Sequence, residues 1–228
     1  MAALDMHEQE QVDALKAWWK DNGLKLTIAI VLAVVVLGGV YAWKQQRAKQ
    51  NAEAAAMFGE VQKQVSTNDP KRVNDAAAMV VDKFGSTIFA ARAQLLAAQM
   101  NLQFRDSSKA AAQLQWVIDH ASDDGLQDVA RLKLASLRLD EKKYDEAMTL
   151  LNAVHPESFN GLYADLKGDV LSAQGKIEEA RAAYKQALDK IDAKGNYRQL
   201  IQMKLDGLGG ADAHGAAAPA GNSGGSVK

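Results

Sequence analysis

The chain has 228 residues, and its 27 lysines and arginines against 28 aspartates and glutamates give a formal net charge of -1. This balance gives no electrostatic reason to expect a nucleic-acid partner, because proteins that bind duplexes carry a clear basic excess. The chain has no cysteine, which excludes a disulfide scaffold, a thiolate metal site and a cysteine nucleophile. Only 3 prolines and 6% aromatic residues favour helices over an all-β fold.

Residues 1–23 form a short acidic segment. Its apolar residues at spacings of three and seven favour an amphipathic helix over residues 8–20, which Gly23 would end. Such a helix would lie on a membrane surface with its two tryptophans at head-group depth. A disordered acidic tail with interfacial tryptophans explains the same residues equally well. The apolar face consists of Val12, Leu15 and Trp19.

An apolar block follows the acidic segment. Residues 26–43 contain no charged side chain, and with Leu24 and a snorkelling Lys25 the block covers residues 24–43. About 20 helical residues reach roughly 30 Å, which matches the hydrocarbon core of a bilayer. A charge at the bilayer centre costs ~2.5–3.5 kcal/mol, so an uninterrupted run of this length predicts a transmembrane helix.

A cleaved signal peptide is the competing interpretation, with Val40-Tyr41-Ala42 as a small-residue cleavage site. The run is longer than the roughly 7–15 residues of a signal h-region, and the segment before it is long and acidic, so a retained anchor is favoured. Charge does not predict the orientation of this anchor, because three basic residues lie on each side. They are Lys16, Lys20 and Lys25 before the span, and Lys44, Arg47 and Lys49 after it.

Residues 44–208 have a helical pattern. A helix over residues 48–66 is predicted to end before Asn68, and a second helix over 73–84 follows with Gly85 at its end. Between them, Asp69 can cap a helix whose first residue is Pro70. Residues 48–85 are therefore expected to form an atypical capping pair.

Small residues then recur in three units. Hairpins need such residues where two helices approach closely, and the positions four and seven later share one helix face. Hairpins of this kind cannot bury a face alone, so they stack into a solenoid. The small residues are Ala98, Ala135 and Gly168; twelve positions later stand Ala110, Ala147 and Ala180; then come Leu114 and Val117, Leu151 and Val154, Tyr184 and Ala187.

The third unit resembles the tetratricopeptide repeat, with Gly175 in its turn. Arg105 and Lys142 stand at the corresponding turn positions of the more degenerate first and second units. A closing helix is expected over 195–208, and residues 209–228, rich in alanine and glycine, predict a disordered tail. The expected fold is all-α: a single N-terminal transmembrane helix followed by a tetratricopeptide-like α-solenoid of stacked helix hairpins. Its repeat signature is Ala98, Ala110, Ala135, Ala147, Gly168, Gly175, Ala180, Tyr184 and Ala187.

Residues that carry out chemistry do not cluster in this sequence. The four histidines lie in separate segments, and none has a metal-ligand partner at helical spacing. Walker A and GxGxxG motifs are missing. The paired acids Asp123-Asp124 and Glu178-Glu179 are typical of helix caps or solvated faces. We therefore predict a protein that is not an enzyme and has no catalytic, cofactor-binding or metal-ligating residues.

What remains is a binding surface. Arrays of this kind generally bind extended peptides or partner helices in the groove lined by the first helix of each hairpin. In the tetratricopeptide frame this groove would grade from a leucine-rich wall to an acidic one. Its residues would be Arg92, Leu95, Gln99 and Leu102 in the first unit, Val129, Leu132, Ser136 and Leu139 in the second, and Leu162, Asp165, Asp169 and Ser172 in the third.

The second unit allows another interpretation. Its leucines form a helical stripe that would normally face a core, while Arg131 and Arg138 occupy nominal core positions. The first helices can therefore be rotated so that these leucines are core, and the stripe favours core over groove. The stripe is Val129, Leu132, Ala135 and Leu139.

The chain from residue 1 to about residue 208 is similar to one bacterial family. A short acidic segment with the motif Leu15-Lys16-Ala17-Trp18-Trp19-Lys20-Asp21-Asn22-Gly23 runs into a single span, and a tetratricopeptide-like body follows. This combination resembles the YfgM family, ancillary subunits of the SecYEG translocon.

The resemblance implies a single-pass protein of the bacterial inner membrane, with a cytoplasmic N-terminus and a periplasmic body. It implies association with the SecYEG translocon and the periplasmic chaperone PpiD, and a role in passing emerging secretory polypeptides to chaperones. Negative control of the RcsB-dependent envelope stress response is implied for the N-terminal segment. The alternative function is a tethered scaffold or assembly factor for another inner-membrane complex, without a chaperone role.

Overall fold

The computed structural model describes residues 2–191 and 195–214, and every regular element in these ranges is a helix. The chain divides into two units after Glu53. The first unit contains most of helix α1 (Ala2–Val65), and the second contains the end of α1 and all later helices.

Helix α1 runs without a break through Gly23, so the expected end of a short helix there is wrong. A single glycine inside a helix costs only about 1 kcal/mol, and no proline or second breaker supports it. The indole of Trp19 lies over Gly23, about 3.1 Å from where a Cβ would stand. The hydroxyl of Thr27 also donates a 2.8 Å hydrogen bond to the carbonyl oxygen of Gly23, which adds a contact on the C-terminal side of the glycine.

The second unit begins with residues 54–65 of α1, which pack against α2 (Pro70–Phe84) and α3 (Ile88–Gln103). Val61, Val73 and Val80 are fully buried in this contact. Asp69 caps α2, since its side chain accepts hydrogen bonds from the backbone N–H groups of Lys71 and Arg72, the two residues after Pro70.

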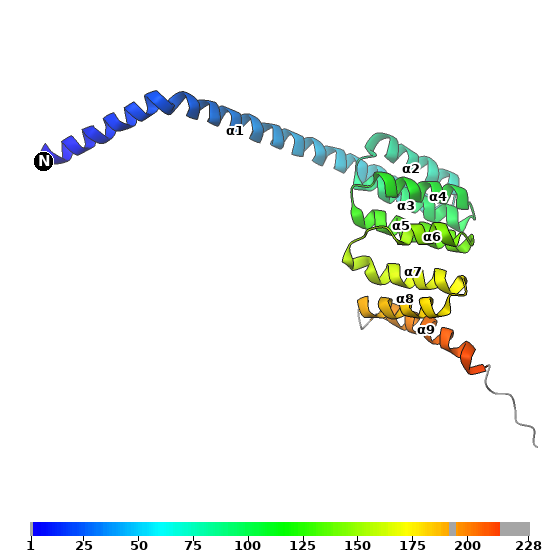
Figure 1. Ribbon diagram of the computed structural model, residues 1–228. Coiled ribbons are helices and arrows are strands. Elements are labelled where there is room, and N and C mark those ends of the chain that lie inside the picture. The colour runs from blue at the N-terminus through cyan, green and yellow to red at the C-terminus, as the bar shows by residue number, and fades with distance from the viewer. Residues whose placement is uncertain (1, 192–194, 215–228) are drawn as a thin grey trace, which may run out of the picture. The chain divides into compact units, whose positions relative to one another are not determined.

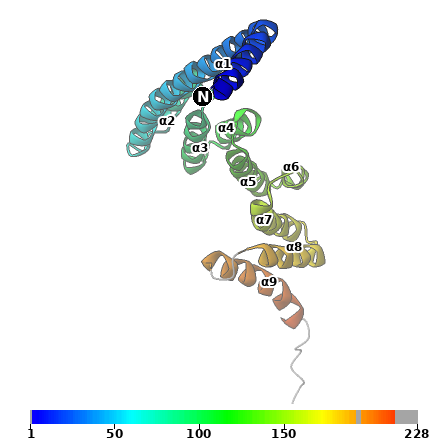
Figure 2. The same ribbon diagram turned by 90° about the vertical axis from the view of Figure 1, so that its left-hand side faces the viewer.

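Three hairpins follow and stack in chain order within this unit (Figures 1 and 2). The first joins α3 to α4 (Ser107–His120) and the second joins α5 (Asp124–Asp140) to α6 (Tyr144–Leu151). The third joins α7 (Asn160–Ala173) to α8 (Ile177–Lys190), and α9 (Asn196–His214) closes the array. The predicted fold class, a tetratricopeptide-like array of helix hairpins after one long apolar helix, is confirmed.

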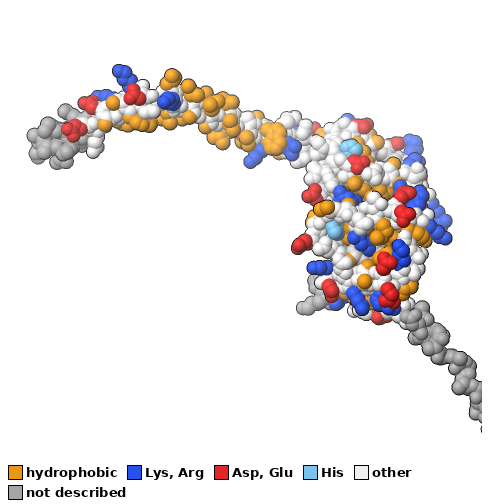
Figure 3. Space-filling model, viewed as in Figure 1, with side chains coloured by type: hydrophobic (Ala, Val, Ile, Leu, Met, Phe, Trp, Pro, Cys, Tyr) orange, Lys and Arg blue, Asp and Glu red, His pale blue; other side chains and the backbone are white. Residues whose placement is uncertain are grey.

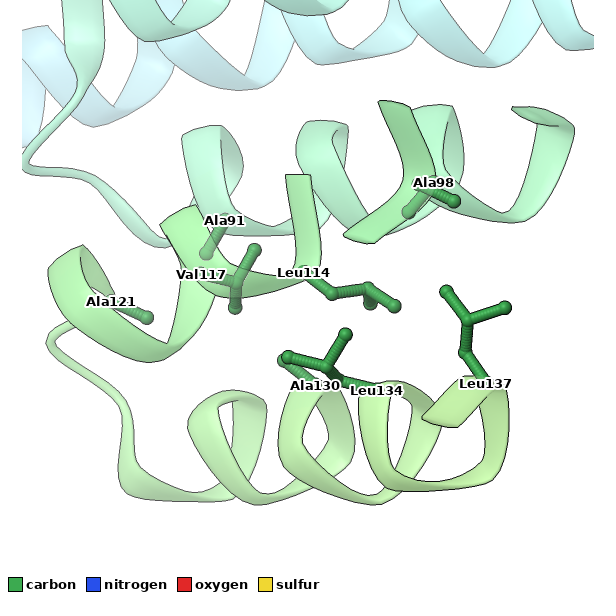
Figure 4. Packing of buried hydrophobic residues seen from close by; sticks show 9 residues of the cluster. Ala91, Ala98, Leu114, Val117, Ala121, Ala130, Leu134 and Leu137 are labelled. Carbon is green, nitrogen blue, oxygen red and sulfur yellow. The ribbon is translucent and has the colours of Figure 1, made fainter. Parts of the chain in front are cut away.

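Small residues let the helices of each hairpin approach closely. Ala98 and Ala110 have no exposed surface, and Leu114 fills the space between α3, α4 and α5 (Figure 4). In the third hairpin a Cβ on Gly168 would lie 2.5 Å from the ring of Tyr184, so only glycine fits there.

Helix α6 is much shorter than its counterparts: it has 8 residues, whereas α4 and α8 have 14 each. It ends at Leu151, and Val154 is 95% exposed in the loop that follows, so the expected place of Val154 on the packed helix face is wrong. Pro156 disfavours helical backbone at His155, so the helix could not have extended through this loop into α7. A short 3₁₀ helix (Glu157–Phe159) then leads into α7.

The closing helix is longer than expected. Helix α9 continues past residue 208 to His214, so the expected tail from residue 209 is helical over its first six residues. Residues 215–228 lie outside the described part of the chain.

Candidate functional site

Two surfaces carry the candidate function, an apolar helix and a groove. The apolar stretch of α1 reaches a mean hydropathy of 2.4 over 18 residues, and none of it is buried. By length and composition it is the one described helix that could cross a membrane. Figure 3 shows hydrophobic side chains all along it. Leu24, at its start, is 75% exposed. Such a surface is unfavourable in water and favourable in lipid, so the protein is membrane-anchored.

The end of this stretch carries a feature typical of membrane interfaces. The guanidinium of Arg47 lies over the ring of Trp43, 4.5 Å from its centroid. An interfacial tryptophan with a cation on its face can stay at head-group depth while the cation remains hydrated.

The groove lies between α5, α7 and α9 and encloses a cavity of about 300 Å³. Five of the predicted groove residues line it: Leu132, Ser136, Leu162, Asp165 and Asp169. Four further residues complete the lining, namely Lys133, Leu166, Tyr197 and Lys204. The lining is therefore mixed in character. Leucines and a tyrosine provide apolar contact area, and two aspartates and two lysines lie among them.

The acids at this groove are already paired. Asp165 is 3% exposed and accepts hydrogen bonds from the hydroxyl of Tyr197 (2.6 Å) and from the Lys204 ammonium (3.0 Å). Asp169 accepts from Lys204 (2.8 Å) and from the hydroxyl of Tyr184 (2.7 Å). The acidic wall expected from the sequence is therefore wrong, because Lys204 from α9 pairs with both carboxylates and Lys133 adds a second positive charge to the lining.

This cluster shifts the titration of its members. Burial raises the pKa of Tyr184 and Tyr197, and the hydrogen bonds to Asp169 and Asp165 raise both further. Burial would lower the pKa of Lys204, but its hydrogen bonds to the two carboxylates outweigh that effect and raise it. The lysine therefore stays charged and the tyrosines stay neutral at physiological pH.

The other predicted groove residues lie outside this cavity. In α3, Arg92 and Gln99 are exposed, while Leu95 and Leu102 are half-buried against the cluster around Ala98. In α5 and α7, three more predicted residues are half-buried but do not line the groove: Val129, Leu139 and Ser172.

The leucine stripe of α5 contributes both to the core and to the groove. Leu132 and Leu139 are half-buried and pack against the cluster that includes Tyr163, so they belong to the contact between the second and third hairpins. Leu132 keeps one side in the groove. The arginines at nominal core positions are accommodated by ion pairs: Arg131 with Asp128, and Arg138 with Glu141 and Glu146.

Sequence reasoning missed Tyr197 and Lys204 as groove residues. They are seven positions apart in α9, two helical turns, so they lie on one face. That spacing is the signal that could have placed them together. The carboxylates they bind lie 32 to 39 residues earlier in the chain, which no local pattern predicts.

Within the described ranges, no group of three or more histidine, aspartate or glutamate side chains is arranged so that it could hold a metal ion. Asp123 instead caps α5 by accepting from the backbone N–H of Leu126.

Known proteins resemble this chain over almost its full length. A family model described as a tetratricopeptide repeat-like domain matches residues 16–210, which include both the apolar stretch and the hairpins. A Neisseria gonorrhoeae protein named ancillary SecYEG translocon subunit is 32% identical over 207 residues, 90% of this chain and 99% of its own length. Proteins of the same name from Haemophilus influenzae and Escherichia coli are 29% and 28% identical, over 90% and 89% of this chain and 100% and 97% of their own. These matches confirm the family resemblance, and the chain belongs to the YfgM family of ancillary SecYEG translocon subunits.

Proposed function

We propose that this protein is a membrane-anchored adaptor that associates with the SecYEG translocon and uses its hairpin array to bind partner polypeptides. The observation that carries the proposal is the extent of the similarity: the relatives match the anchor and the array together, over almost their own full length. A role at a membrane channel needs both parts, one to hold the protein in the bilayer and one to bind.

The orientation we propose places residues 1–23 in the cytoplasm and the hairpin array in the periplasm. The support is the resemblance to the YfgM family, since the basic residues flanking the span are balanced. In this orientation the array meets polypeptides as they emerge and can pass them to a chaperone such as PpiD.

The groove between α5, α7 and α9 is our candidate for the polypeptide contact. Leucines and a tyrosine offer apolar area without a preference for one sequence, and the paired charges leave little net field to repel a segment of either sign. A surface of this kind suits transient binding of many different extended segments.

The N-terminal segment is a separate candidate. We infer that its cytoplasmic part takes part in negative control of the RcsB-dependent stress response, as the family resemblance implies. Its exposed tryptophans and acidic residues would then serve a cytoplasmic partner or the inner leaflet.

Site-specific photocrosslinking in cells tests the adaptor function. A photoreactive residue at Ser136 or Leu162 in the groove should form adducts with a SecYEG subunit or with a secretory chain in transit. The matched control is Met79, which is also exposed but lies on α2 away from the groove. Equal adducts from Met79, or none from the groove at normal expression, would contradict the proposal.

The absence of cysteine makes the orientation easy to test. Single cysteines at Lys16 and Asn152, both exposed, can be labelled in cells with a permeabilised outer membrane and a membrane-impermeant maleimide. We expect labelling of Asn152→Cys and protection of Lys16→Cys. The reverse pattern would place the array in the cytoplasm and favour the scaffold function instead.

A further inference from the structure

The short helix α6 leaves part of α5 without a covering helix. In the third hairpin the chain just after α8 brings Ile191 against Gly161, at the start of α7. In the second hairpin α6 stops at Leu151, and the corresponding part of α5 faces a loop instead. A cavity of about 370 Å³ occupies this place, between the first half of α5 and residues 154–156.

A buried carboxylate with one unused oxygen lines this cavity. Asp128 is 1% exposed, and its Oδ1 accepts hydrogen bonds from the Tyr163 hydroxyl (2.7 Å) and from Arg131 (2.6 Å). Its Oδ2 has no hydrogen-bond partner among the described residues. A buried polar atom without a partner destabilises the fold, and more so when it is charged, so this oxygen is an acceptor that lacks a donor.

The charges around the cavity favour a cation as that donor. Arg131 is already engaged, because its guanidinium also donates to the Gln127 side chain at 3.1 Å. Asp124 adds a second carboxylate to the lining, and His155 lies against the ring of Tyr163 at 3.8 Å between centroids. The cavity lining therefore holds two carboxylates against one guanidinium, which Asp128 and Gln127 already engage, and the cavity is large enough for a side chain.

We propose that this cavity is a binding site for the ammonium or guanidinium group of a basic residue on a partner polypeptide. Val154, almost fully exposed at the cavity, would contact an apolar residue beside that basic one. The site is separate from the groove, since the two share no lining residue, and it does not depend on what the groove binds.

Disulfide tethering in the full chain in detergent tests this site. Val154→Cys supplies the sole thiol of a chain without cysteine, and it exchanges with the symmetric disulfides of aminothiols of two to six carbons in competition with those of hydroxythiols of equal length, releasing one free thiol each time. The exchange swaps one thiol for the other on the same protein sulfur without net oxidation, so intact-mass measurement reads their relative stabilisation directly. Tethering raises the local concentration enough to detect a weak contact.

At one chain length we expect the aminothiol to be favoured by about fivefold or more over its hydroxyl match, as a charge-assisted hydrogen bond implies. In Asp128→Asn the preference should fall to about one. Met79→Cys on α2 is the control for general attraction of cations, and it should show no preference that depends on chain length.

Circular dichroism shows whether Asp128→Asn keeps its fold. If it does not, Gln127→Trp replaces it, since this variant fills the cavity while Asp128 stays in place, and it should abolish the preference as well. Equal binding of both thiols at every length would overturn the proposal and leave the cavity to water. A preference that survives both variants would overturn the assignment to Asp128.

Discussion

Arg105, Lys142 and Gly175 hold the same left-handed backbone conformation at the turns of the three hairpins, with φ of 61°, 60° and 75°. In each turn the N–H of the next residue bonds to a carbonyl five residues back, at 2.8 to 2.9 Å. This is the Schellman arrangement, which glycine adopts without the steric cost that a Cβ adds. Arg105 and Lys142 therefore adopt a backbone conformation that would cost glycine less free energy.

We predict that Lys142→Gly stabilises the protein by about 0.5–1 kcal/mol. The left-handed conformation costs a residue with a Cβ roughly 1–2 kcal/mol, and glycine avoids this cost but loses more backbone entropy on folding, which offsets part of the gain. The measurement is the thermal midpoint of the full chain in detergent, followed by circular dichroism. Lys133→Gly is the matched control: it lies inside α5 and should lose about 1 kcal/mol. A loss in both variants would contradict the prediction.

Gly168 makes a second prediction at this scale. A Cβ there would stand 2.5 Å from the Tyr184 ring, so Gly168→Ala should cost about 1–3 kcal/mol through overpacking. In a Tyr184→Val background the ring is gone, and the same substitution should cost less than half as much. The test is a double-mutant cycle, in which the unfolding midpoints of the unmutated protein, the two single variants and the double variant are compared. Strictly additive effects would mean that the ring does not limit this position.

At the scale of elements, side chains whose protonation matters hold both α8 and α9 to α7: Tyr184 from α8, and Tyr197 and Lys204 from α9. Tyr184 and Tyr197 have raised pKa values because they are buried and donate to carboxylates, and the pKa of Lys204 is raised by the same carboxylates in spite of burial. A group whose pKa is higher when folded stabilises the fold fully below its unfolded pKa, here about 10, and loses that contribution as the pH rises further.

We therefore expect the unfolding midpoint to be flat from pH 8 to 9.5 and to fall above about pH 10. The variant Tyr184→Phe/Tyr197→Phe removes two of the titrating groups, so its midpoint should fall less steeply over the same range. Thermal unfolding followed by circular dichroism at each pH measures both. Identical slopes in the two proteins would show that other groups control the alkaline transition.

The sequence predicts these elements unevenly, and the reason is the distance over which each contact acts. The Asp69 cap, Pro70 as first helical residue and the turn at Lys142 depend on neighbours within a few residues, so local patterns are enough. The repeat spacing misplaces Val154 because it assumes a second helix of full length, whereas α6 ends at Leu151.

The groove shows the same limit more strongly. Leu132 and Leu162 follow from the repeat frame, whereas Lys204 enters from a closing helix that has no place in that frame. A second example is the amide cluster in which Asn101 bonds to Asn74 and Gln113, from two other helices. Amide pairs of this kind join residues 12 and 27 positions apart, and only packing brings them together.

At the scale of the whole molecule, one helix determines where the protein resides. Val35 lies in the middle of the apolar stretch and is 64% exposed, so its side chain is not buried among the described residues. We predict that Val35→Arg costs ~2.5–3.5 kcal/mol of insertion and lowers the membrane-bound fraction, because the charge must enter the hydrocarbon core. Val35→Leu should change nothing. Carbonate extraction of membranes measures both, and full retention of Val35→Arg would argue against a spanning helix.

The bonds from Tyr197 and Lys204 to α7 reach past α8, the immediate neighbour of α9. Repeat arrays normally behave as one-dimensional chains, in which each unit feels only the next and the ends fray one helix at a time. Here the terminal helix is coupled to its second neighbour, because losing it leaves two carboxylates of α7 without their cation. The end of this array should therefore open as a single cooperative block, and the backbone amides of α7, α8 and α9 should exchange their hydrogens with one common free energy.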